Sequence, residues 1–267
     1  MMPRYAVMGY PIAHSLSPTI HHLFAEQTGK TVLYEKIEID LPHFEQQVMD
    51  FFAQGGMGLN ITLPCKERAF AMSDDKSGRC LKAGAANTLW MKNARLQADN
   101  TDGIGLIRAL QRHVELPQKT ILVIGAGGAV RGILGPLLEN RPQTLVVANR
   151  TIEKALALQQ HFPKMSICSL DNLSHHPACG QFDLIINATS ASLGEQSVAL
   201  PEAILANKPF CYDLAYNRHQ DTAFIEWVKS QGCAARDGIG MLVEQAAEAF
   251  FIWHGIMPDA KSVLDKL

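Results

Sequence analysis

The sequence predicts an α/β protein of two domains, the second of which contains a doubly wound parallel sheet. Two observations indicate this. Apolar strand-like segments alternate with helical segments through residues 120–231, which is typical of parallel strands joined by right-handed crossovers. A separate mixture of strands and helices occupies residues 1–104, and Pro117 breaks the chain before the second set. A chain of 267 residues is long enough for two modest domains.

The composition is that of an ordinary globular protein. Apolar residues make up 47%, charged residues 19%, and the net charge is −2. Without a basic excess or a long apolar run, we expect neither a nucleic-acid nor a membrane partner. The N-terminus lacks the apolar core of a signal peptide. The six cysteines have no C-x-x-C spacing and are expected to be reduced thiols in a cytoplasmic protein. The spacing of the His and Cys residues matches no metal-binding pattern, so we expect no metal site.

The elements of the first domain follow from apolar periodicity and from the positions of Gly and Pro. A helix is expected to begin at Ser17-Pro18, with Ser17 as its cap, and to end at Gly29. A second amphipathic helix over residues 42–54 stops at Gly55-Gly56. The other expected elements are strands over 5–9, 33–40, 58–63, 85–91 and 96–99, and a helix over 102–113.

The second domain is expected to begin at residue 105 and to end near residue 237. The last segment, residues 238–267, contains an amphipathic helix from Met241 to His254 and is expected to join the first domain. The expected elements between these limits are strands near 120–125, 144–148, 165–168, 182–187 and 209–213, and helices near 128–139, 151–161 and 221–231.

A glycine-rich turn follows the first strand of the second domain. It reads Gly125-Ala126-Gly127-Gly128-Ala129 and opens the expected helix. Glycines here let backbone N–H groups approach a diphosphate, which the positive end of the helix helps to hold. Val130 occupies the usual third small position, so we expect Gly127-Gly128-Ala129 to provide the close packing of helix on strand. The turn indicates a dinucleotide site in a Rossmann-type domain.

Arg150 indicates which dinucleotide is bound. It lies in Asn149-Arg150-Thr151 at the end of the second strand, where NAD sites usually carry Asp or Glu for the ribose 2′-hydroxyl. A guanidinium suits a 2′-phosphate, so the expected cofactor is NADP and the expected class is an oxidoreductase. The alternative interpretation of Arg150 is a solvated charge at a strand end.

Polar side chains cluster in the expected loops of the first domain. Together they offer hydroxyls, amides, one cation and one carboxylate, which suits a small polyhydroxylated acid with a Lys/Asp pair for proton transfer. Helix capping remains an alternative for Ser17 and for Asn100-Thr101-Asp102, and an ordinary surface lysine for Lys66. Asn87 is expected inside an apolar strand, where an amide needs a partner or a ligand. The cluster comprises Ser15, Ser17, Asn60, Thr62, Lys66, Asn87, Asn100, Thr101 and Asp102.

Ordered segments along nearly the whole chain resemble the shikimate dehydrogenase family. In the first domain these are Gly9-Tyr10-Pro11, His14-Ser15-Leu16-Ser17-Pro18, Asn60-Ile61-Thr62-Leu63-Pro64-Cys65-Lys66, Gly84-Ala85-Ala86-Asn87-Thr88-Leu89 and Asn100-Thr101-Asp102-Gly103. They continue through the glycine turn, Asn149-Arg150-Thr151, Asn187-Ala188-Thr189-Ser190, Asp213-Leu214-Ala215-Tyr216 and Gly238-Ile239-Gly240-Met241-Leu242, with Gln245.

The resemblance implies NADPH-dependent reduction of 3-dehydroshikimate to shikimate, in the biosynthesis of chorismate and the aromatic amino acids. It implies a substrate domain and a cofactor domain with a cleft between them, in a monomer or a homodimer. Lys66 and Asp102 are the implied catalytic pair. The implied substrate-binding residues are Ser15 and Ser17 for the carboxylate, and Thr62, Lys66, Asn87, Asp102, Tyr216 and Gln245 for the ring. The implied cofactor-binding residues are Gly125, Ala126, Gly127, Gly128, Ala129, Asn149, Arg150, Thr151, Thr189, Leu214, Gly238 and Met241.

Three positions depart from the family pattern, and three other functions stay open. His22, Ser192 and Arg218 replace the usual Asn, Gly and Pro, which bears on loop shape and cofactor affinity rather than on the Lys/Asp pair. One alternative is a quinate/shikimate dehydrogenase that uses NAD. A second is a non-catalytic sensor of shikimate or quinate, and a third is a dehydrogenase for another small carbonyl compound or a folate.

Overall fold

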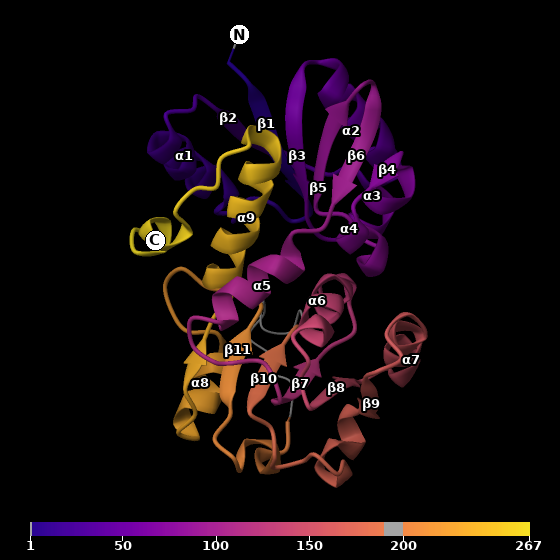
Figure 1. Ribbon diagram of the computed structural model, residues 1–267, viewed down its shortest axis with the longest axis vertical. Helices are drawn as coiled ribbons and strands as arrows, with labels where there is room; N and C mark the ends of the chain where they lie inside the picture. Colours follow the sequence, from indigo (N-terminus) through magenta and orange to yellow (C-terminus); the bar gives the residue numbers. More distant parts are fainter. Residues whose placement is uncertain (1, 190–199) are drawn as a thin grey trace. The chain divides into compact units, whose positions relative to one another are not determined.

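A computed structural model describes residues 2–189 and 200–267 of the chain (Figure 1). The chain divides into two units: one comprises the residues up to Leu106 together with Leu242–Leu267, and the other comprises Ile107–Met241. Both boundaries fall inside helices, α5 (Asp102–Leu110) and α9 (Ile239–His254), slightly further along the chain than residues 104 and 237.

The first unit contains a six-stranded mixed sheet with the order β2-β1-β3-β5-β6-β4. Its β1 is parallel to β2 and β3, whereas β5 is antiparallel to β3 and β6. The strands are β1 (Arg4–Gly9), β2 (Leu33–Glu38), β3 (Gly56–Ile61), β4 (Asp75–Lys76), β5 (Thr88–Lys92) and β6 (Arg95–Asp99). Its other helices are α1 (Ser17–Thr28), α2 (Phe44–Ala53) after a short 3-10 turn (Leu41–His43), α3 (Lys66–Met72), α4 (Gly78–Ala83) and α10 (Ala260–Leu264).

Helices cover both faces of this sheet, as the alternation of side chains along β1 requires. Ala6 and Met8 point into the buried cluster that α2 closes. Tyr5 points to the other face and meets Trp253 of α9, with ring centroids 5.1 Å apart. A Cβ added to Gly58 of β3 would lie 2.4 Å from the Trp253 ring, so this glycine permits the close approach of α9.

The second unit contains a parallel six-stranded sheet with the order β12-β11-β10-β7-β8-β9. The chain leaves β7 toward β8 and β9 on one side and then returns to build β10, β11 and β12 on the other. The carboxyl ends of β7 and β10 therefore flank a topological switch point, where ligands bind in such sheets. The elements are β7 (Thr120–Ile124), α6 (Gly128–Glu139), β8 (Thr144–Asn149), α7 (Ile152–His161), β9 (Ser166–Ser169), β10 (Leu184–Asn187), β11 (Phe210–Asp213), α8 (Ala223–Ser230) and β12 (Ala235–Arg236), with short 3-10 turns at Leu170–His175 and Glu202–Leu205.

The long elements lie where the sequence predicts them, with ends shifted by a few residues. Three local predictions are wrong. Ser17 is not the cap of α1 but its first residue; Leu16 occupies the cap position, and the Ser17 N–H donates to Ser15 Oγ. Asn87 directly precedes β5 rather than lying inside it. The helix that begins at Asp102 ends at Leu110 rather than His113. No pattern in the sequence predicts the short α3, α4, β4 and β12.

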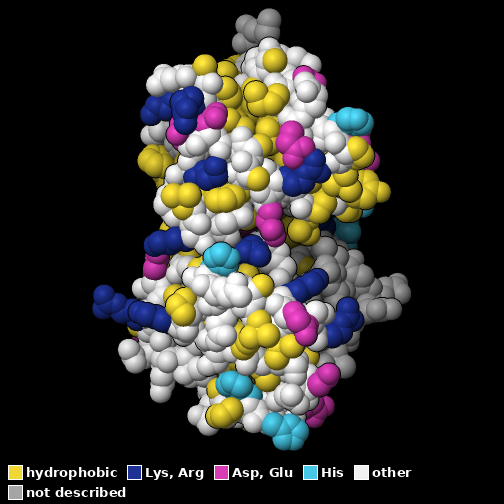
Figure 2. Space-filling model, turned by 90° about the vertical axis from the view of Figure 1, so that its right-hand side faces the viewer, with side chains coloured by type: hydrophobic (Ala, Val, Ile, Leu, Met, Phe, Trp, Pro, Cys, Tyr) yellow, Lys and Arg dark blue, Asp and Glu magenta, His cyan; other side chains and the backbone are white. Residues whose placement is uncertain are grey.

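Charges of both signs are mixed on the face drawn in Figure 2. Lys and Arg side chains alternate there with Asp and Glu, and hydrophobic groups lie between them, so the residues coloured in that view form no continuous basic surface. In the part of the chain that the structure describes, no helix combines the length and apolar character needed to cross a membrane.

Candidate active site

Lys66 and Asp102 form a close, nearly buried ion pair in the first unit. The Lys66 Nζ lies 2.6 Å from Asp102 Oδ2, and the side chains are 12% and 6% exposed. Each is the first residue of a helix, Lys66 of α3 and Asp102 of α5. The carboxylate therefore sits at a positive helix end, and the pair satisfies charges that would be costly to bury singly.

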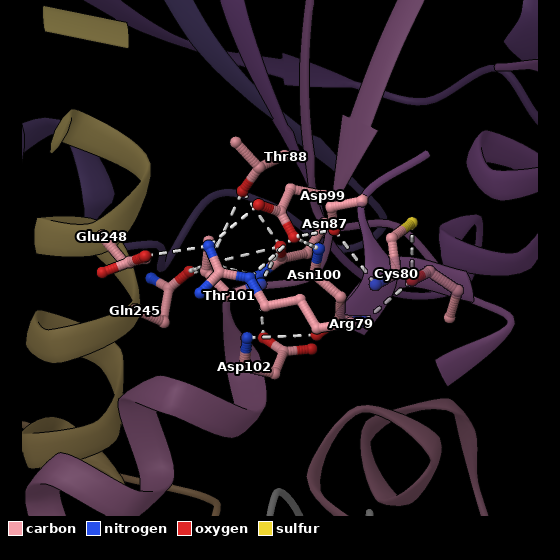
Figure 3. A network of polar contacts seen from close by, with 12 residues as sticks. Arg79, Cys80, Asn87, Thr88, Asp99, Asn100, Thr101, Asp102, Gln245 and Glu248 are labelled. Atoms are coloured by element: carbon pink, nitrogen blue, oxygen red, sulfur yellow. Dashed lines mark hydrogen bonds and ion pairs between the residues drawn. The ribbon is translucent and has the colours of Figure 1, made fainter. Parts of the chain in front are cut away.

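Asn87 joins this pair to Gln245 of α9 (Figure 3). Its Nδ2 lies 2.9 Å from Asp102 Oδ1 and 3.3 Å from Gln245 Oε1. Its Oδ1 accepts hydrogen bonds from the Thr101 N–H at 2.8 Å and from the Thr88 hydroxyl at 2.9 Å. Asn87 is 2% exposed, and this set of partners explains how its amide is buried.

A second chain of hydrogen bonds connects Ser17 to the same place. Ser15 Oγ and Ser17 Oγ are 3.2 Å apart, and the Ser17 N–H donates to Ser15 Oγ. The Tyr34 hydroxyl donates to Asn60 Oδ1 at 2.7 Å, and Asn60 Nδ2 donates to the Asn87 carbonyl at 3.0 Å. Burial raises the pKa of Tyr34 well above its usual value, while a hydrogen bond from Ser17 lowers it, so the phenol stays protonated. The sequence reasoning missed Tyr34.

Thr62 is placed by the end of β3 beside the end of β1. Its N–H donates to the Met8 carbonyl at 2.9 Å. A Cβ added to Gly9 would lie only 2.2 Å from the Thr62 Cγ2, so Gly9 makes room for the threonine. The first-unit residues predicted from the sequence lie close to the ends of strands or the starts of helices. They are in the loop before α1 (Ser15), at the end of β3 or just after it (Asn60, Thr62), directly before β5 (Asn87), between β6 and α5 (Asn100, Thr101), or on α1, α3, α5 and α9.

The predicted cofactor residues of the second unit also follow strand ends. The glycine turn follows β7, Asn149 ends β8, Thr189 follows β10, and Leu214 follows β11. Gly125 has φ +113, and a Cβ there would lie 3.0 Å from the Ala188 carbonyl oxygen, so this position requires glycine. These strand ends border the switch point described above.

Two glycines of the turn face open space among the described residues. A Cβ added to Gly127 or Gly128 would meet none of their atoms within 4 Å, so the prediction that these glycines provide helix–strand packing is wrong. Gly127 is the cap residue of α6, and no side chain caps the helix. The first N–H groups of a helix have no partner within it, so they are directed at this space. Open glycines at an uncapped helix start fit a diphosphate.

The residues at the end of β8 are accessible. Arg150 and Thr151 are exposed, and Asn149 Nδ2 donates to the Thr151 carbonyl at 2.7 Å. Among the described residues, the Arg150 guanidinium has no ion pair or hydrogen bond. The guanidinium is therefore not committed to a structural role there and could meet an anion.

Hydrogen bonds to backbone or side-chain oxygens hold the other predicted cofactor residues. The Gly238 N–H donates to the Ala215 carbonyl at 3.0 Å, and a Cβ on Gly238 would lie 2.2 Å from the Leu214 carbonyl oxygen. The Met241 N–H donates to the Tyr212 hydroxyl at 2.9 Å. Tyr216 is partly buried just after β11, and the Thr189 hydroxyl donates to Asn187 Oδ1 at 2.9 Å. Ser190 and Ser192 lie outside the described residues.

Three family models match the chain in order. They are described as the shikimate dehydrogenase substrate binding domain (residues 7–89), shikimate / quinate 5-dehydrogenase (108–223) and the shikimate 5'-dehydrogenase C-terminal domain (238–267). The shikimate dehydrogenase (NADP(+)) of Legionella pneumophila strain Lens is 58% identical over 267 residues, covering 100% of this chain and 99% of the relative. The chain belongs to the shikimate dehydrogenase family.

Solved structures of the family have the same two-domain architecture, which confirms the predicted fold class. An Ael1 enzyme from Pseudomonas putida has a TM-score of 0.91 at 44% identity and covers 99% of this chain and 98% of its own. The shikimate 5-dehydrogenase of Thermus thermophilus, solved in complex with NADP(H) and shikimate, has a TM-score of 0.88 at 33% identity, with coverages of 99% and 98%.

Proposed function

We propose that this protein catalyses the reversible, NADPH-dependent reduction of 3-dehydroshikimate to shikimate, in the pathway to chorismate and the aromatic amino acids. The observation that carries this proposal is the nearly buried Lys66–Asp102 pair, bound to Asn87, in a chain of the shikimate dehydrogenase family. The reaction is inferred from the family, and the pair provides the ammonium and the carboxylate that proton transfer in this reaction requires.

The first unit offers separate groups for the two kinds of polar function on the substrate. The hydroxyls of Ser15 and Ser17, which are 3.2 Å apart, are proposed to donate to the carboxylate. Thr62, Asn87, Asp102 and Gln245 are proposed to bind the ring hydroxyls. Since Asn87 already holds Asp102 and Gln245 together, these groups are arranged before the substrate arrives, which lowers the cost of orienting it.

Lys66 is the proposed proton donor to the ketone oxygen. During reduction, negative charge grows on that oxygen, and an ammonium both stabilises the charge and delivers a proton. Asp102 accepts a hydrogen bond from Lys66 and so directs the ammonium, and its other oxygen is held by Asn87. In the reverse direction the same Lys66 amine accepts the proton.

The second unit is proposed to bind the cofactor, and bound NADPH would supply the hydride. The glycine turn, Gly125 to Ala129, would hold the diphosphate with its backbone N–H groups. Asn149, Arg150 and Thr151 would meet the 2′-phosphate. Thr189, Leu214, Gly238 and Met241 are proposed to line the ribose and nicotinamide, and Tyr216 to contact the substrate.

Absorbance at the nicotinamide band tests the proposal, with pure protein and shikimate supplied with NADP or NAD. We expect turnover with NADP and a large preference for it over NAD. Lys66→Ala should lower kcat by roughly 10²–10⁴-fold. Lys92→Ala, which changes an exposed lysine at the end of β5, is the matched control and should keep full activity.

Other outcomes would point to the alternatives. Preference for NAD, or equal turnover of quinate, would favour a quinate/shikimate dehydrogenase. Shikimate binding without turnover by either cofactor would contradict the proposed enzyme and favour a sensor. Lack of both binding and turnover with shikimate would favour a different small carbonyl substrate.

We also propose the cytoplasm as the compartment, with the protein acting as a monomer or a homodimer. All six cysteines are free thiols. Reducing compartments keep thiols in this form, and burial raises the pKa values of Cys80 and Cys211, which makes these two unreactive.

A further inference from the structure

A cluster of charged side chains lies next to residues that are proposed to bind the substrate (Figure 3). Arg79 of α4 forms a two-pronged contact with Asp99 at the end of β6, from Nε to Oδ1 at 2.7 Å and from Nη2 to Oδ2 at 2.8 Å. The same Nη2 lies 2.9 Å from Glu248 Oε1 of α9. Arg79 is 30% exposed, whereas Asp99 and Glu248 are only 8% and 10% exposed.

One arm of this cluster leads to Asp102. Asp99 Oδ1 accepts the N–H of Asn100 at 2.7 Å. The Asn100 side chain in turn accepts the N–H of Asp102 at 3.1 Å and donates to the Ala85 carbonyl at 2.9 Å. The orientation of the Asp99 carboxylate therefore determines the path of the chain into Asp102.

The other arm leads to Gln245. Glu248 and Gln245 are three residues apart on α9 and so share one face of the helix. The helix is also pressed against the start of α5, because a Cβ on Gly105 would lie 2.7 Å from the Gln245 backbone nitrogen. Arg79 thus holds together the two segments that carry Asp102 and Gln245.

We propose that Arg79 is a positioning residue that sets the separation of Asp102 and Gln245, and thereby the recognition of the substrate's ring hydroxyls. The inference rests on the proposed function. A guanidinium presents a rigid fork that can bind two carboxylates at once, which the single ammonium of a lysine cannot reproduce. Without this fork, two nearly buried carboxylates repel each other and the segments move apart.

The test compares Arg79→Lys with a matched control, Arg95→Lys. Arg95 lies on the same strand as Asp99 and makes the same two-pronged contact with Asp75, at 2.8 and 2.9 Å, but it is 56% exposed and far along β6 from Asp102. Each variant is assayed with shikimate and with a 4-deoxy analogue of shikimate, which lacks the hydroxyl next to the reacting carbon. The KM for NADP and the thermal midpoint are measured alongside.

We expect Arg79→Lys to lower kcat/KM for shikimate about ten- to hundredfold, because displacements near 1 Å at a reacting group have effects of this size. The loss should be smaller for the 4-deoxy analogue, so the preference for shikimate falls, while the KM for NADP stays the same. Arg95→Lys should leave all these values unchanged. Glu248→Gln keeps the shape of the acceptor without its charge, and it should also lower the preference for shikimate over the 4-deoxy analogue. This second variant tests the proposal even when Arg79→Lys is too unstable to purify.

An equal loss with both substrates, in Arg79→Lys or in Glu248→Gln, would overturn the positioning role, because it would indicate general destabilisation. Unchanged kinetics in both variants would overturn it as well. Absence of turnover by the unaltered protein would instead overturn the proposed function, and the inference with it.

Discussion

At the residue scale, the charged groups proposed for the reaction and for cofactor binding differ in how far they are enclosed. Lys66 and Asp102 are enclosed, 2.6 Å apart, and are further bound by Asn87. Arg150 is exposed and, among the described residues, has no ion pair. An enclosed pair keeps its geometry through a reaction, whereas a free guanidinium can close on an incoming phosphate.

Arg150 should therefore decide the choice of cofactor. We expect Arg150→Ala to raise the KM for NADPH roughly ten- to hundredfold, because a charge-assisted hydrogen bond contributes about 1.5–3 kcal/mol. The KM for NADH should change little, since NADH lacks the 2′-phosphate. Steady-state kinetics with both cofactors measures this. Lys164→Ala, at an exposed site after α7, is the control, and an equal rise for NADH would contradict the assignment.

Substitution by alanine should have different effects at Gly238 and Gly127. Gly238→Ala places a Cβ 2.2 Å from the Leu214 carbonyl oxygen, and backbone cannot yield cheaply there, so we expect a lower thermal midpoint. Among the described residues, the Cβ of Gly127→Ala meets no atom within 4 Å, so the midpoint should stay unchanged, yet the substitution should weaken NADP binding by filling the proposed diphosphate space. Calorimetry and a titration with NADP separate the two effects. A normal midpoint for Gly238→Ala would contradict the steric argument.

Sequence reasoning identified the residues proposed to face ligands but not those behind them. Lys66, Asn87 and Asp102 lie in short polar motifs, where types and spacing are informative. Glu248 gave a weaker signal, as an acidic residue among apolar neighbours that must have a partner when buried, whereas Asp99 lies in a polar run before α5 and gave none. Their partner, Arg79, comes from a short helix elsewhere in the chain, and no local pattern connects them.

At the element scale, the chemistry lies where helices and strands end. Ser17, Lys66 and Asp102 are the first residues of α1, α3 and α5. Patterns found the long elements, since apolar periodicity needs several residues to be visible. They did not find α3, which has seven residues, or β4 and β12, which have two residues each. The two short strands form by pairing with β6 and β11.

The contact between α1 and α9 should make the first unit sensitive to acid. His21 of α1 is 1% exposed and stacks on Tyr34. Burial, together with the charge of His254, lowers the pKa of His21 to about 3. In acid the unfolded chain binds a proton that the folded chain does not, so stability is complete above pH 6.5 and falls toward pH 3. Between pH 7.5 and 5 the loss due to His21 should be about 2 kcal/mol.

Urea unfolding at pH 7.5, 6 and 5 measures this loss. His21→Phe keeps an aromatic ring beside Tyr34 but removes the titration, so its stability should vary less with pH, by about the same 2 kcal/mol. The adjacent His22 is exposed and, within the described residues, pairs with Glu26 alone, which makes His22→Phe a matched control with an unchanged pH profile. If His21→Phe retained the acid sensitivity of the unaltered protein, another group would be responsible.

At the scale of the whole molecule, the two kinds of ligand should act on different units. The proposed proton donor and hydroxyl-binding residues belong to the first unit, and the glycine turn and Arg150 belong to the second. The sequence indicated this division, because the β-α alternation and the glycine turn start only after Pro117. The sequence could not show that the boundaries between the units fall inside α5 and α9, because the apolar pattern of each helix continues without a break across its boundary.

Hydrogen exchange with each ligand alone should reveal the division. A ligand at 100 times its Kd stabilises the state that binds it by about 2.7 kcal/mol, which slows exchange through unfolding of that state by roughly a hundredfold. NADP should protect residues 125–131 and 149–151, and shikimate should protect residues 60–66 and 100–105. Mass spectrometry of peptides from both regions reads the two effects in one sample. Protection of residues 60–66 by NADP as strong as that of the glycine turn would contradict the assignment of the cofactor site to the second unit alone.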